Sequence, residues 1–120
     1  MSEQLDFSGA LNSIGALDGG LNAVCRDLAI WRISMGADAR SDDPRSTQAR
    51  LMGIVAECAE AYEAVRADDR ENLEEEMADI FIRWAGLCGL LHMLDIEDVI
   101  RRKMTHNLFS GRYGGMREAM

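Results

Sequence analysis

Residues 57–60 read Glu-Cys-Ala-Glu and residues 76–79 read Glu-Met-Ala-Asp, and these two stretches decide the expected fold. Carboxylates three positions apart in an α-helix lie on one face, about 60° from each other around the axis. Each pair stands in a segment whose apolar residues recur every three or four positions, which is typical of a helix. Two consecutive helices, each with an acidic face, are therefore predicted.

The four acids of these stretches are candidate metal ligands: Glu57, Glu60, Glu76 and Asp79. Carboxylates that converge from neighbouring helices repel each other strongly unless cations hold them. Hard oxygen ligands of this kind suit Mg²⁺, with Mn²⁺ as a possible substitute. The sequence thus indicates a metal-dependent reaction on an anionic substrate. The open alternative is a non-catalytic helical dimerisation module, because acids near a helix N-terminus also interact favourably with the helix dipole.

An all-α fold is predicted, an antiparallel bundle of four to five helices completed by dimerisation. Asp43 and Pro44 supply an N-cap and a first helical residue for the second helix. The short turn at Asp68 and Asp69 makes the second and third helices antiparallel neighbours. The predicted helices cover about 21–35, 44–66, 70–92 and 96–108. The expected inward residues are Leu51, Ile54, Val55, Cys58, Tyr62 and Val65, then Leu73, Met77, Phe81, Trp84, Cys88 and Leu91.

The length of 120 residues suits a single domain over 1–120, with a core of about 21–110 and extensions at 1–20 and 111–120. No apolar run approaches the ~20 residues of a membrane span, and the first residues lack the features of a signal peptide. We therefore expect a cytoplasmic protein with no membrane partner.

The net charge and the cysteine content argue against several classes of function. The formal net charge of −8 argues against nucleic-acid binding, which depends on clustered Lys and Arg. The three cysteines form no C-x-x-C motif, so we expect buried thiols rather than disulfides or a zinc site. An anionic substrate must then be recruited by metal ions and a few basic side chains.

Candidate substrate-binding residues follow from placement on the helices. Lys103 and Asn107 are one turn apart on the last helix, and Arg112 follows in a glycine-rich tail. An amide and two cations suit contacts with phosphate and base. Arg83 lies one turn after Asp79, so it either pairs with that acid or reaches past it toward a phosphate.

In the order of its motifs the chain resembles the MazG-like nucleotide pyrophosphohydrolases of the all-α NTP pyrophosphatase superfamily. That family's pattern is Glu-Glu-x-x-Glu, then Glu-x-x-Asp, then Lys-x-x-x-Asn with an Arg beyond. The likeness extends over about residues 31–113. The chain departs from the pattern at Ala56, which replaces the first Glu, and at Arg83, where some relatives have an aromatic residue. The Asn107-to-Arg112 spacing is also longer than in many members.

The resemblance implies hydrolysis between the α- and β-phosphates of a nucleoside triphosphate, with Glu57 or Glu60 as general base. It also implies magnesium ligands at Glu57, Glu60, Glu76 and Asp79, and nucleotide contacts from Lys103, Asn107 and Arg112. A related alternative within the fold is phosphoribosyl-ATP pyrophosphohydrolase. Because helices with two functional faces need more burial than one short chain supplies, we expect a homodimer or homotetramer.

Overall fold

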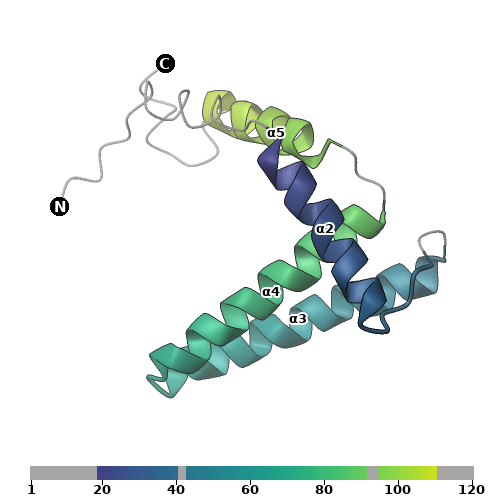
Figure 1. Ribbon diagram of the computed structural model, residues 1–120. Helices are drawn as coiled ribbons and strands as arrows, with labels where there is room; N and C mark the ends of the chain where they lie inside the picture. The colour runs from purple at the N-terminus through teal and green to yellow at the C-terminus, as the bar shows by residue number, and fades with distance from the viewer. Residues whose placement is uncertain (1–18, 41–42, 92–94, 111–120) are drawn as a thin grey trace. The chain divides into compact units, whose positions relative to one another are not determined.

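The computed structural model describes residues 19–40, 43–91 and 95–110 (Figure 1). Within these ranges the chain forms four helices and no strand: α2 (Gly20–Ser34), α3 (Pro44–Arg66), α4 (Arg70–Leu90) and α5 (Ile96–Ser110). The all-α prediction is confirmed, and α5 continues to Ser110 rather than Leu108. None of these described helices combines the length and apolar character that membrane crossing requires.

Side-chain caps fix where α3 and α4 begin. Asp43 accepts a hydrogen bond from the backbone N of Arg45 at 2.9 Å, and Pro44 is the first helical residue. Asp69 accepts from the backbone N of Asn72 at 3.1 Å. Asp68, with a φ of 54°, adopts the left-handed conformation that reverses the chain between the two helices. As a result α3 and α4 form an antiparallel hairpin, which is visible in Figure 1.

The described residues belong to two compact units, one within residues 23–94 and the other within 1–22 and 95–120. In the first unit, α3 contributes the small buried residues Ala61 and Ala64. α2 approaches α4 so closely that a side chain at Gly89 would collide with the backbone carbonyl of Cys25. Glycine is therefore required at that crossing.

Two buried thiols also meet in this unit. Burial, followed by the proximity of Cys25, raises the pKa of the Cys88 thiol to about 11. Neither side chain is exposed, so both act as small apolar residues. The expectation of buried cysteines is wrong for Cys58, which is exposed on α3.

The second unit contains α5 and the residues that start it. Asp95 accepts a hydrogen bond from the backbone N of Asp98 at 3.0 Å, which confirms the predicted cap. Asn22 accepts from the backbone N of Glu97 at 3.1 Å and donates to Asp95 at 3.3 Å. These contacts satisfy backbone donors that the first turn of a helix leaves free.

Most of the stripe that we expected to point inward on α3 is exposed in the single chain. Its large members lie about half in solvent or more: Leu51 50%, Val55 54%, Tyr62 62% and Val65 60%. On α4 the same holds for Met77 and Phe81, whereas Cys88 is buried. The prediction was wrong for these residues because α3 turns the small Ala61 and Ala64 inward instead. Helices whose facing residues are small can approach closely without using their large apolar side chains.

Candidate functional site

The antiparallel hairpin of α3 and α4 brings three of the predicted acids together. Glu57 comes from α3, and Glu76 and Asp79 come from α4. One carboxylate oxygen from each lies within 4.8 Å of the other two. Glu57 and Glu76 are half-buried, whereas Asp79 is exposed at the edge of the group. We call these three residues the carboxylate cluster.

Glu60 lies beside the carboxylate cluster rather than in it. It is exposed on α3, one turn after Glu57, and its carboxyl is within hydrogen-bonding reach of Glu76. Glu60 and Glu76 also share an open groove of about 470 Å³ that Glu63 and Asn72 help to line. The fourth predicted acid is therefore close to the cluster, on a solvent-accessible side.

The electrostatics of the cluster favour a bound cation. When both side chains are ionised, the Oε2 atoms of Glu57 and Glu76 are buried with no hydrogen-bond donor among the described residues. A proton on Glu76 can bridge the pair. This hydrogen bond, together with burial and the nearby Glu60, raises the pKa of Glu76 to about 7, and the same bond lowers the pKa of Glu57. Buried carboxylate oxygens without donors fit a divalent ion with oxygen ligands.

The raised pKa of Glu76 gives a prediction about pH. In metal-free protein we expect the free energy of unfolding to fall as pH rises from 4.5, the ordinary pKa of Glu, to about 7. The folded state binds the Glu76 proton more tightly than the unfolded state, so this stability is complete below 4.5 and is lost as pH passes 7. Urea unfolding in EDTA at a series of pH values measures this dependence of the free energy of unfolding on pH. Glu76→Gln should flatten the plot of unfolding free energy against pH between 4.5 and about 7. An unchanged slope in that variant would show that Glu76 is not the group responsible.

Arg83 pairs across the hairpin with Glu57. Its Nε donates to Oε1 of Glu57 at 3.2 Å, so its observed partner is neither of the two considered from the sequence. A Cβ at position 53 would come within 2.8 Å of Nη1 of Arg83. Gly53 therefore leaves the space in which the Arg83 guanidinium lies over α3.

Two arginines near Arg83 were missed from the sequence. Burial, followed by the charges of Arg83 and Arg50, lowers the pKa of Arg32, which shows that the three guanidinium groups are neighbours. Arg50 could have been found, because it stands seven positions before Glu57 and so shares its face of α3. Arg32 gave no comparable signal, since α2 carries no acidic motif.

The remaining predicted residues do not belong to the hairpin of α3 and α4. Lys103 is exposed and Asn107 is half-buried, and both are on α5 in the second unit. Arg112 falls outside the described residues. The structure thus collects Glu57, Glu60, Glu76, Asp79 and Arg83 at one place on the hairpin.

Comparison with known proteins identifies the family. The MazG nucleotide pyrophosphohydrolase domain matches residues 45–107, which is more than half of the 120 residues. This region includes the carboxylate cluster, Glu60 and Arg83, as well as Lys103 and Asn107. No curated protein and no solved structure gives a significant match. The family match confirms the resemblance inferred from the motifs, and the chain belongs to the MazG nucleotide pyrophosphohydrolase domain family.

Proposed function

We propose that the chain is an Mg²⁺-dependent nucleoside triphosphate pyrophosphohydrolase that yields a nucleoside monophosphate and pyrophosphate. The observation that carries this proposal is the convergence of Glu57, Glu76 and Asp79 within 4.8 Å. Such a cluster at the centre of a MazG match suits a metal-assisted reaction on a polyphosphate. Because the match spans residues from both compact units, we also propose that 1–120 act as one domain.

The cluster residues would hold the metal, with Mn²⁺ as a possible substitute. When bound, Mg²⁺ neutralises charge on the phosphate oxygens and makes a coordinated water easier to deprotonate. Arg83 keeps the Glu57 carboxylate oriented through its 3.2 Å contact. The cluster side chains would thus bind the metal with little movement of the two helices.

Glu60 is our candidate for general base. It is exposed beside the cluster, and no ion pair of the described residues occupies its carboxylate. In the reaction the water oxygen bonds to a phosphorus of the α–β bridge while that phosphorus–oxygen bond breaks. The bridging oxygen keeps the electron pair, and the proton of the water passes to Glu60.

The nucleotide itself needs further contacts. A pocket of about 480 Å³ includes Glu57 and Asp79 together with Trp31 and Met35 of the α2 end. Trp31 is 50% exposed, so its ring is available for a nucleobase to stack on. Lys103, Asn107 and Arg112 remain proposed nucleotide contacts.

Pyrophosphate release from a panel of nucleoside and deoxynucleoside triphosphates tests the proposed function. We expect turnover with Mg²⁺ and none in EDTA. Activity on phosphoribosyl-ATP alone would support that related enzyme instead. If no nucleotide is cleaved and millimolar Mg²⁺ leaves thermal stability unchanged, the chain is a non-catalytic helical module.

We also propose a homodimer built on the exposed face of α3. Leu51, Val55, Cys58, Tyr62 and Val65 follow one another at alternating spacings of four and three, and all are exposed in the single chain. This spacing is that of a helix-packing seam. A second copy would remove the apolar seam from water, which is the usual role of such a surface in an oligomer.

The dimer gives a prediction about Cys58, the middle residue of the seam. In a two-fold symmetric pairing centred on the seam, each Cys58 lies next to its copy. We expect a mass of twice 13.3 kDa in solution and a disulfide-linked dimer after mild oxidation. Cys58→Ser should keep the mass and lose the cross-link. A monomer, or a dimer that does not cross-link through Cys58, would contradict this seam, and four times the chain mass would indicate a tetramer.

A further inference from the structure

We infer that Arg32, Arg50 and Arg83 form a pyrophosphate subsite that binds the β- and γ-phosphates of the nucleotide beside the carboxylate cluster. The identity of the nucleotide rests on the proposed function. The subsite itself rests on the contacts, the burial and the charge of the three arginines.

Two of the three arginines, Arg32 and Arg50, have no ion-pair partner in the part of the chain that the structure describes. The Nε and Nη2 atoms of Arg50 are buried without a hydrogen-bond partner among the same residues. In a chain with a net charge of −8, unpaired and partly buried cations are unexpected unless an anion binds them.

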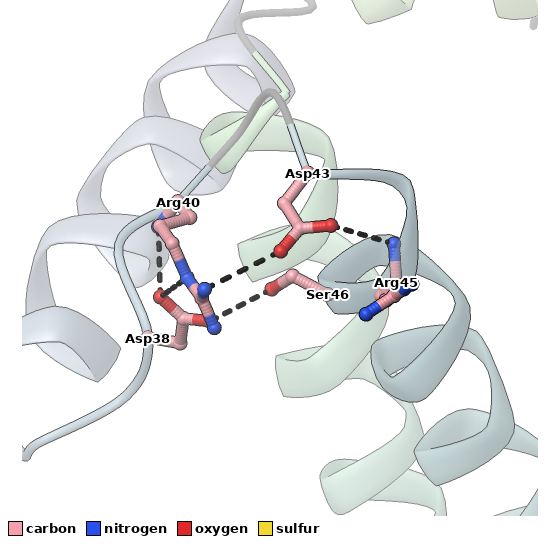
Figure 2. A network of polar contacts seen from close by, with 5 residues as sticks. All are labelled: Asp38, Arg40, Asp43, Arg45 and Ser46. Carbon is pink, nitrogen blue, oxygen red and sulfur yellow. Dashed lines mark hydrogen bonds and ion pairs between the residues drawn. The ribbon is translucent and has the colours of Figure 1, made fainter.

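Asp38 and Asp43 line the same pocket as the three arginines, but both carboxylates already have partners. Arg40 pairs with Asp38 at 2.8 Å and with Asp43 at 3.3 Å, and both contacts can be followed in Figure 2. Ser46 donates to Asp38 at 3.0 Å, and Asp43 also caps α3 through the backbone N of Arg45. This network holds the loop before α3 in place and pairs both carboxylates with Arg40 rather than with Arg32 or Arg50.

The positive charges of the three guanidinium groups also repel one another. Burial and the neighbouring charges of Arg83 and Arg50 lower the pKa of Arg32. Like charges gathered in this way raise the free energy of the empty site, and an anion between them relieves the repulsion. Planar guanidinium groups can each contact two phosphate oxygens, so a pyrophosphate suits them better than a single carboxylate does.

Two pockets with shared lining residues indicate how a triphosphate would be oriented. Arg32, Arg50 and Arg83 line a pocket of about 550 Å³. The pocket that contains Glu57, Asp79 and Trp31 shares Arg32 and Arg83 with it. A triphosphate can therefore place its most highly charged end on the arginines, its α–β bridge at the carboxylates and its nucleoside toward Trp31.

Calorimetric titration with inorganic pyrophosphate, with Mg²⁺ and again in EDTA, tests the subsite without requiring turnover. We expect Arg50→Gln and Arg32→Gln to raise the dissociation constant about tenfold or more, as the loss of a charged hydrogen bond does. Arg66→Gln, an exposed arginine at the end of the same helix as Arg50, should change it less than twofold. Binding of a nucleoside monophosphate should also change less than twofold. The subsite would be overturned if Arg50→Gln and Arg32→Gln weakened the binding of both compounds equally, or if they left pyrophosphate binding unchanged.

Gly53→Ala provides a second variant that removes no charge. The new methyl group would displace Nη1 of Arg83, which is the mobile end of a flexible side chain. We expect weaker pyrophosphate binding together with an unchanged or higher thermal midpoint, because Ala is the better helix former. If Gly53→Ala binds pyrophosphate as tightly as the wild type does, Arg83 does not belong to the subsite.

The two proposals fail in different ways. If the wild-type chain cleaves no nucleotide but binds pyrophosphate through the arginines, the subsite stands and the proposed function falls. If it cleaves nucleotides and Arg50→Gln has a wild-type KM and wild-type affinity for pyrophosphate, the function stands and the subsite falls.

Discussion

Glu60→Gln is expected to lower kcat about 10²- to 10⁴-fold, the range that a positioned general base contributes. Glu60 is exposed beside the cluster but does not belong to the three carboxylates whose oxygens gather within 4.8 Å. Its amide replacement therefore removes the proton acceptor without removing a cluster ligand. We expect the affinity for Mg²⁺ to change only a few-fold, and the metal-free fold to be as stable as the wild type or more so, since one like charge is lost.

Single-turnover kinetics and a Mg²⁺ titration of the same preparation measure both parts of this prediction. Glu74→Gln is the matched control, because Glu74 is exposed and pairs with Arg70 at 3.9 Å. That variant should have wild-type kcat. Full activity in Glu60→Gln would exclude Glu60 as the base, and a parallel loss of metal affinity would make it a ligand instead.

Asp79→Asn is expected to abolish the stabilisation of the folded chain by Mg²⁺, and most turnover with it. A metal at one hundred times its dissociation constant adds about 2.7 kcal/mol to the free energy of unfolding. Asp79 belongs to the group of three oxygens, and an amide at its position cannot supply the negative charge that Mg²⁺ requires. The variant should still fold, because Asp79 is exposed and its replacement relieves repulsion within the cluster.

Chemical unfolding with and without Mg²⁺ measures this loss. Glu75→Gln is a suitable control: it removes one charge from an exposed position of α4 next to the cluster. We expect its Mg²⁺-dependent stabilisation to match the wild type. An equal metal-dependent shift in Asp79→Asn and the wild type would show that the cation binds elsewhere.

The sequence by itself determined the helices and the acids that they present. Asp43, Asp69 and Asp95 each accept a hydrogen bond from a backbone N in the first turn of a helix. Such caps involve neighbours in the sequence, so they can be recognised without knowledge of the fold. The same holds for Glu76 and Asp79, whose shared face follows from helix geometry alone.

Only the tertiary structure decided which faces meet. Ala61 and Ala64 turn inward, and this leaves Leu51, Val55 and Tyr62 exposed despite their apolar spacing. Periodicity identifies an apolar stripe but not which partner covers it, because the rotation of a helix depends on how closely its neighbours can approach. A stripe that serves a second copy looks the same in the sequence as one that serves the core.

The contacts of the arginines at the site likewise could not be predicted from the sequence. Arg83 contacts Glu57 across the hairpin, 26 residues away in the sequence, in space that Gly53 leaves open. Arg32 joins it from α2, which approaches α4 at glycine positions. Contacts of this kind depend on the distance between helix axes, and that distance is set by small residues packed against other elements. Local sequence rules therefore supplied the carboxylates, whereas the packing of three helices placed the cations beside them.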